Sequence, residues 1–385
     1  IHHALIDGIG GMAMLESTLT KSPTQRMPHA IWHPDRDPRR RRSRSGPRGP
    51  LRQLLSFYGA MFARAAELPD LGVAVAKMGI AGMMPGKKRV AVPFRAPKTV
   101  LNVPISSSRR FATKSIPLDQ VKLMGKGVGG TVNDIVLAIC AGALRRYLIE
   151  HGELPKAPLI GTVAVSIRKK ADGISGNQLT ALLCNLATDI EDPIERLKII
   201  MESVADGKSD LAERTNATAK NLALLLGVVT IAMQELKLTE PLPPPYNLII
   251  SNVRGPSHPL YMNGARLVAN YPMSLLGDGQ ALNMTVLSHE DTMNFGLLGC
   301  RDALPDLDRL ADCLEESFLE LKQAVGAAAT ARAMSEAEAE PEADPNIRRA
   351  PDRALTPAKI SAKPAPTNRQ TGARAGEAKL RRPTV

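Results

Sequence analysis

The apolar and polar positions alternate with the period of β-strands in several stretches after Arg109. Four such stretches predict strands, and two pairs of short stretches predict hairpins, because the residues between them favour tight turns. The predicted strands are Phe111–Ile116, Leu159–Ile167, Leu179–Asp189 and Asn247–Val253, and the predicted hairpins are Tyr261–Arg266 around Asn263-Gly264 and Leu282–Leu298 around His289–Asp291.

Between these strands the pattern changes to helical spacing, often with a recognisable first residue. Asp192, Pro193 and Glu195 stand in the order typical of a helix start. The predicted helices are Pro117–Met124 with Ser115 as its cap, Asn133–His151, Pro193 to about Asp206, one or two helices over 211–238, and Asp306–Val325, with Gly326 as the end of the last.

The first hundred residues are less regular. Ile1 reads as the end of a strand, three glycines (Gly8, Gly10 and Gly11) as a turn, and Met12–Leu19 as a short helix. A loop rich in proline and arginine follows, then apolar residues 51–84, which Pro69 divides into two helices, and a crossover to Pro104. We therefore expect an α/β (α+β) protein with four parts: 1–50, 51–104, 105–326 and a disordered tail, 327–385.

Composition narrows the class of protein. The chain has 385 residues, of which 44% are hydrophobic, so it can bury a large core, but aromatic residues are 3%, which argues against a surface that stacks nucleic-acid bases. Its formal charge of +12 lies mostly in seven arginines between Arg39 and Arg52 and in the C-terminal tail. The remainder is close to neutral, so we expect no nucleic-acid partner.

The cysteine spacing and the length of the apolar runs indicate the cellular compartment of the protein. None of the four cysteines (Cys140, Cys184, Cys300 and Cys313) has a partner at C-x-x-C spacing, which indicates reduced, buried thiols in a cytoplasmic protein. No apolar run reaches the roughly 18 residues needed to cross a bilayer, and no signal peptide is predicted. The chain opens without Met inside a motif, so we expect a fragment of a longer protein.

The sharpest motif is the sequence His2-His3-Ala4-Leu5-Ile6-Asp7-Gly8. Neutral imidazole can accept a hydroxyl proton near neutral pH, so a histidine at a strand end suits a general base. Neighbouring residues of a strand point to opposite faces, so one of the two histidines can serve a given site. The alternatives are a metal-binding pair, for which no third ligand stands at suitable spacing, and an accidental surface pair.

With further motifs, the chain resembles the bacterial wax ester synthase/acyl-CoA:diacylglycerol acyltransferase family. The resemblance runs from residue 1 to about 326. The stretches that carry it are HHALIDG at 2–8, GGTVNDIVLA at 129–138, GNQLTALLCNLATDIEDPIERL at 176–197, NLIISNVRGP at 247–256 and NFGLLGCRDALPDLDRL at 294–310.

The resemblance implies a two-lobed, chloramphenicol-acetyltransferase-like fold with the histidine motif in a tunnel between the lobes. The first lobe is expected to be incomplete here. By the same resemblance His3 is the general base that deprotonates diacylglycerol or a long-chain alcohol, which then attacks acyl-CoA. His2 would hold the motif, Gly8 would let backbone and substrate approach, and Asp7 would pair with a basic group, for which Arg168 is a candidate.

Two further motifs have both a structural and a functional interpretation. Asn133 suits a helix cap, and the resemblance places Asn133 and Asp134 beside the active site, where they would support His3 or the oxyanion. The end of the predicted strand 247–253 carries Ser251 and Asn252, and Arg254 follows it directly. These residues are interpreted either as turn residues or as residues that line the tunnel or contact CoA. The glycines 125, 127 and 130 match G-x-G-x-x-G but follow a helical pattern, which argues against a dinucleotide site.

The sequence thus predicts an acyl-CoA-dependent O-acyltransferase with acyl-CoA as co-substrate and with neither metal nor cofactor. The basic stretch and the apolar segment after it suit a peripheral membrane or lipid-droplet surface, although a solvated loop beside core helices has the same composition. Two other hypotheses stay open: acyl transfer to another acceptor, such as the amine of a carrier-bound peptide, and an inactive lipid-surface binding protein.

Overall fold

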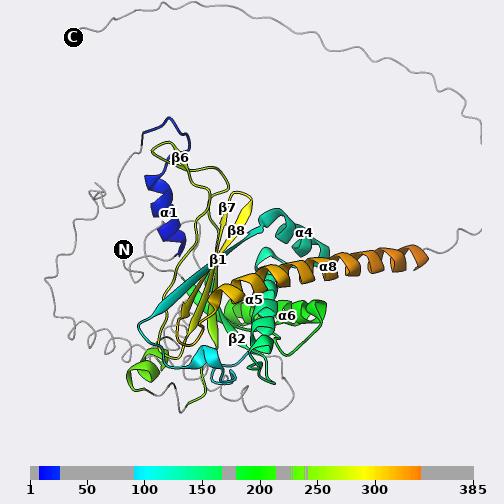
Figure 1. Ribbon diagram of the computed structural model, residues 1–385. Coiled ribbons are helices and arrows are strands. Elements are labelled where there is room, and N and C mark those ends of the chain that lie inside the picture. Colours follow the sequence, from blue (N-terminus) through cyan, green and yellow to red (C-terminus); the bar gives the residue numbers. More distant parts are fainter. Residues whose placement is uncertain are drawn as a thin grey trace, which may run out of the picture. The chain divides into compact units, whose positions relative to one another are not determined.

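The computed structural model describes residues 8–26, 91–166, 179–213, 227, 229–237, 239 and 242–339 (Figure 1). By the contacts between residues within the chain, the protein divides into two compact units, Ile1–Ala337 and Glu338–Val385. The predicted basic loop, the predicted apolar helices of 51–84 and the tail beyond Ala339 lie outside the described residues.

The described strands form a mixed six-stranded sheet in the order β1-β8-β7-β4-β2-β3, with a separate β5–β6 hairpin. β4 runs parallel to β7 and to β2, and the other pairs are antiparallel. The strands are β1 (Arg109–Pro117), β2 (Ile160–Ser166), β3 (Leu179–Asn185), β4 (Leu248–Val253), β5 (Tyr261–Met262), β6 (Ala265–Arg266), β7 (Leu282–His289) and β8 (Thr292–Cys300). Every strand and hairpin predicted by the alternating pattern is therefore present.

Four helices pack against one face of this sheet, which we call the helix face (Figure 1). They are α4 (Leu118–Val128), α5 (Val132–Glu150), α6 (Pro193–Glu213) and α8 (Leu307–Ala339). Alternate strand residues, such as Ile250, Met284 and Phe295, join them in one buried core. α5 is apolar all round because helices and sheet enclose it, and 13 of its 19 residues are buried.

The opposite face, which we call the outer face, carries the other half of each strand. Residues 268–275, which we call the strap, pass over this face. They lie so close to Gly296 that an added Cβ there would collide with the carbonyl oxygen of Pro272. The strap follows the β5–β6 hairpin, whose turn residues Asn263 and Gly264 have φ of 49° and 85°, as a two-residue hairpin turn requires. Two helical elements complete the description: α1 (Gly8–Thr18) and the single 3₁₀ turn η3 (Val100–Asn102).

Helix ends account for the differences from the sequence-based predictions. α1 begins at Gly8, so Gly8, Gly10 and Gly11 lie in the helix and do not form a turn. Ser115 is part of β1, and Pro117 stands at the N-cap of α4 without a side-chain cap bond. α8 continues through Gly326 to Ala339, because glycine lowers helix propensity without preventing a helix. Asp192 does cap α6, accepting a 2.7 Å hydrogen bond from the backbone N–H of Glu195, and α6 runs past Asp206 to Glu213.

The four cysteines are free and buried, as predicted. Burial raises the pKa of the Cys140 thiol to about 12, so this thiol stays protonated near neutral pH. Among the described helices, none alone has the length and apolar composition to cross a membrane. Taken together, α4 and α5 have that length and composition, but the pair is bent by 102° at the junction of the two helices.

Candidate active site

The histidine motif ends where α1 begins. Gly8 is both the last residue of HHALIDG and the first residue of α1, whereas His2, His3 and Asp7, as well as Arg168, lie outside the described residues. The first turn of α1 therefore holds the carboxyl end of the motif. A helix N-terminus also favours negative charge nearby, because its first N–H groups have no partner within the helix.

The second predicted pair lies at the start of α5. Thr131, and not Asn133, is the N-cap, and it forms a capping box with Asp134. The Asp134 carboxylate accepts hydrogen bonds of 2.8 Å from both the backbone N–H and the hydroxyl of Thr131. The predicted cap role of Asn133 is thus wrong, because the N-cap lies two residues earlier, at Thr131. Asp134 is 6% exposed, and its bonds to Thr131 give it a structural role whatever else it does.

The third group, Ser251, Asn252 and Arg254, lies at the carboxyl end of β4. Ser251 pairs with Thr285 of β7, and Asn252 with Val286. Because neighbouring residues of a strand alternate, Ser251 belongs to the outer face and Asn252 to the helix face. Within the described part of the chain, no hydrogen bond joins these residues to Asn133 or Asp134. Arg254 is exposed after the strand ends.

A polar cluster on the outer face was not predicted from the sequence. The Ser115 hydroxyl donates to Oδ1 of Asn294 at 2.7 Å and lies 2.9 Å from the Tyr271 hydroxyl. Asn294 is fully buried, and its Nδ2 has no hydrogen-bond partner among the described residues. The available signal was the asparagine itself, a polar residue inside a strand whose other members are mostly apolar.

The strap connects this cluster to α1. Asn270 Nδ2 lies 3.9 Å from the sulfur of Met12, and Tyr271, the next residue, reaches Ser115 of β1. At its other end α1 leads into Thr20, which exchanges backbone hydrogen bonds of 2.9 and 2.8 Å with Tyr261. The helix that follows the histidine motif is therefore held against the segment that crosses the outer face.

An open groove of about 570 Å³ lies elsewhere, along the crossover segment. Its lining residues are Lys98, Thr99, Val100, Asn102, Val103, Pro104 and Glu153. None of them belongs to the predicted site, and the groove therefore adds no residue to it.

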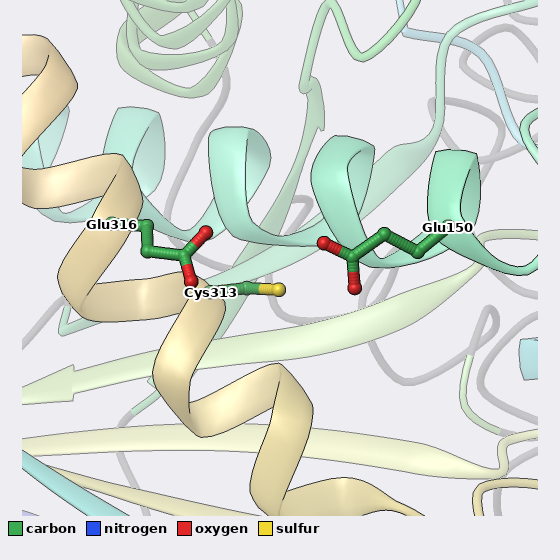
Figure 2. Close-up of side chains that lie close together, drawn as sticks. All are labelled: Glu150, Cys313 and Glu316. Carbon is green, nitrogen blue, oxygen red and sulfur yellow. The ribbon is translucent and has the colours of Figure 1, made fainter.

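One set of side chains has the donor types of a metal site. Figure 2 shows the side chains of Glu150 from α5 and of Cys313 and Glu316 from α8 close together. Arg309 occupies the position that a cation would take, because its guanidinium donates hydrogen bonds of 2.6 Å to both carboxylates. The bonded Arg309 lowers the pKa of both glutamates. We therefore interpret this cluster as an ion-pair network between two helices.

Comparisons with known proteins agree with the motifs. The sequence model of the wax ester synthase/diacylglycerol acyltransferase catalytic domain matches residues 1–136, and that of the WS/DGAT C-terminal domain matches residues 175–322. The first match includes the complete HHALIDG motif and the start of α5, and the second extends from β3 into the first half of α8.

Individual relatives give the same result. The chain is 41% identical over 327 residues to a putative diacylglycerol O-acyltransferase of Mycobacterium tuberculosis, a match that covers 85% of this chain and 70% of the relative. It is 38% identical over 325 residues to the O-acyltransferase WSD of Acinetobacter baylyi, covering 83% of this chain and 68% of that protein.

A solved structure confirms the fold. The wax ester synthase/diacylglycerol acyltransferase from Marinobacter aquaeolei VT8 matches with a TM-score of 0.59 and 33% identity over 85% of this chain and 67% of its own. The expected mixed α/β fold of the chloramphenicol-acetyltransferase type is therefore confirmed. On the family models, the relatives and this structure together, the chain belongs to the wax ester synthase/diacylglycerol acyltransferase family of O-acyltransferases.

Proposed function

We propose that this O-acyltransferase moves a fatty acyl group from acyl-CoA to the hydroxyl of diacylglycerol or of a long-chain alcohol, with His3 as the general base. The observation that carries the proposal is the match of the family's catalytic domain to residues 1–136, which contain HHALIDG without a gap. Acyl-CoA is a co-substrate, and the reaction needs neither a metal nor a further cofactor.

The chemistry needs one proton acceptor and no covalent enzyme intermediate. The neutral imidazole of His3 takes the proton of the acceptor hydroxyl, while the oxygen of that hydroxyl attacks the thioester carbonyl carbon. The tetrahedral intermediate collapses with cleavage of the carbon–sulfur bond. The proton on His3 then passes to the departing CoA thiolate, which leaves ester, CoA thiol and neutral His3.

Hydrogen-bond donors would stabilise the oxyanion of that intermediate. The first turn of α5, which contains Asn133, offers backbone N–H groups with no partner inside the helix. We propose that His2 and Asp7 hold the motif in place, and that Ser251, Asn252 and Arg254 contact the tunnel or CoA.

The test uses purified protein, palmitoyl-CoA and either dioleoylglycerol or hexadecanol, with release of CoA thiol as the readout. We expect release that depends on an acceptor, and we expect His3→Ala to abolish it, with His2→Ala as the neighbouring histidine control. Undiminished turnover by His3→Ala would contradict the base assignment. Transfer to an amine acceptor in preference to either alcohol would favour the alternative acceptor class.

We further propose that the protein is cytoplasmic and works at the surface of a membrane or lipid droplet. Both proposed acceptors reside in lipid, and the arginines between Arg39 and Arg52 precede an apolar segment, a combination that suits an anionic lipid surface. Flotation with phosphatidylglycerol vesicles but not with phosphatidylcholine vesicles is the expected result. Flotation without CoA release by the wild type would favour a lipid-binding protein without activity.

A further inference from the structure

We propose that Asn294 is a substrate-binding residue whose Nδ2 donates a hydrogen bond to a carbonyl oxygen of the bound acyl substrate. The proposal rests on the acyltransferase function proposed above and assigns that reaction a residue on the outer face of the sheet. It concerns the class of group bound, a carbonyl oxygen, which both the thioester of acyl-CoA and the ester groups of diacylglycerol contain.

Asn294 has an unused hydrogen-bond donor. Its side chain is 0% exposed, and in the part of the chain that the structure describes its Nδ2 has no hydrogen-bond partner. Buried polar groups are normally paired, because losing water without gaining another partner is unfavourable. An orphaned donor inside a fold therefore needs an explanation, and a ligand that supplies the missing acceptor is one.

A hydrogen bond from Ser115 sets the orientation of the Asn294 carboxamide. Ser115 donates to Oδ1 of Asn294 at 2.7 Å, which leaves Nδ2 directed away from that bond. Ser115 faces the outer side because its neighbour Lys114 reaches across the helix face to Asp312 and Glu315 of α8. The donor is thus presented by a rigid strand and a supporting hydroxyl, which is how binding groups are preorganised.

Contacts through the strap lead from Asn294 to the helix that follows the histidine motif. Ser115 also bonds to Tyr271 of the strap, and Asn270 of the strap contacts Met12 of α1, the helix that follows the histidine motif. Two contacts through the strap therefore connect Ser115, the partner of Asn294, to that helix. The surface beside Asn294 is open at the β1 edge, where Ser115 is exposed.

The strap provides a way for substrate to reach the donor. Its apolar side chains are largely outside the core, with Val268 81% exposed, Met273 63% and Leu275 67%. A segment with so few apolar anchors can shift at little cost, and the hydroxyls of Tyr271 and Ser115 link it to β1. Displacement of Tyr271 would bring a substrate carbonyl within reach of Asn294.

The test compares Asn294→Leu with wild type. Leucine has a similar size and lacks the donor, so a residue whose role is to bind substrate should lose activity but keep stability. We expect kcat/KM to fall on the order of 100-fold if the carbonyl is that of the thioester, whose oxygen gains charge in the transition state. The melting temperature should stay at or above that of wild type.

Two acceptors distinguish the two carbonyl sources. With palmitoyl-CoA as donor, loss with both hexadecanol and dioleoylglycerol indicates the thioester, whereas a rise in KM for dioleoylglycerol alone indicates an ester group of the acceptor, because hexadecanol has no carbonyl. Ser317→Ala is the matched control. Ser317 Oγ is also buried and has no hydrogen-bond partner within the described ranges, but it belongs to α8 on the helix face. This control should keep wild-type kinetics.

A second variant covers the case in which Asn294→Leu does not fold. Ser115 is exposed, so Ser115→Ala should fold. This change removes the hydroxyl that orients Asn294 and should lower kcat about tenfold. Ser115→Thr keeps the hydroxyl and should retain wild-type kcat. Wild-type kinetics in folded Asn294→Leu, or in Ser115→Ala when Asn294→Leu is unfolded, would overturn the proposal. Absence of CoA release by the wild type would instead refute the acyltransferase function on which it rests.

Discussion

Asn247 donates from Nδ2 to Oδ1 of Asn102 at 2.7 Å, and both side chains are buried. Asn102 in turn donates to the carbonyl oxygens of Tyr246 and Asn247, and Asn247 Oδ1 accepts from the backbone N–H of Ile160. Two amides therefore satisfy backbone groups of the crossover segment, β2 and the entry to β4. They fasten the segment that precedes β1 to the centre of the sheet.

Asn247→Ala should accordingly lower the free energy of unfolding by about 3 kcal/mol, because several buried backbone groups lose their partners at once. Urea unfolding followed by circular dichroism measures the change. The double variant Asn102→Ala/Asn247→Ala should cost less than the two single changes together, since they share one interaction. Strict additivity would mean that the two amides act independently.

Gly326→Ala should stabilise the protein by about 0.5–1 kcal/mol, because alanine favours the helix and a Cβ at this position meets nothing within 4 Å. Thermal unfolding monitored at 222 nm measures the effect. The contrasting variant is Gly255→Ala, whose Cβ would collide with the carbonyl oxygen of Ser288, so it should destabilise. A destabilised Gly326→Ala variant would argue that the helix ends at Gly326 in solution.

Thr131→Ala should cost about 1 kcal/mol of stability, because it removes the side-chain cap of α5 and one of the bonds that hold Asp134. Asn133→Ala serves as the neighbouring control and should change stability by less than about 0.5 kcal/mol, since Asn133 is not the cap. Equilibrium urea unfolding of both variants tests this. A larger loss in Asn133→Ala than in Thr131→Ala would reverse the assignment of the cap.

The pH dependence of stability should include a contribution from the contact between His151 and Asp306. His151 Nδ1 lies 2.7 Å from the Tyr147 carbonyl oxygen and Nε2 lies 3.0 Å from Asp306 Oδ2, so both ring nitrogens of the charged imidazole have acceptors. The bond to the Tyr147 carbonyl, and then the charge of Asp306, raise the pKa of His151. Burial alone would raise the pKa of Asp306, but hydrogen bonding from Tyr147 and the charge of His151 lower it overall.

His151 therefore adds stability that is fully present below its unfolded pKa of about 6.5 and is lost as pH rises through its raised folded pKa. Asp306 adds stability that is present above about pH 4 and is lost as pH falls through its lowered folded pKa. Both groups are partly exposed, so solvent screening limits the contribution to about 0.5 kcal/mol. His151→Gln should remove the loss on the alkaline side in melting temperatures measured from pH 5 to 8; an unchanged profile would contradict this.

The strand and helix content followed from local patterning. Alternation along β7 and β8, the Asn263-Gly264 turn and the Asp192-Pro193 helix start each act within a few residues, and each was confirmed. Gly326 misled the prediction because glycine lowers helix propensity without preventing a helix, and the other residues of the long α8 outweigh it.

The amino-acid sequence by itself determined the family, because the order and spacing of five motifs need no coordinates, and it determined which residue types can carry the chemistry. Tertiary structure decided the partners. Arg309 joins two glutamates 166 residues apart in sequence, and Ser115 orients Asn294 across strands that are distant in the chain. Hydrogen bonds extend over about 3 Å, so such contacts depend on how strands and helices are registered against each other, which local patterning does not specify.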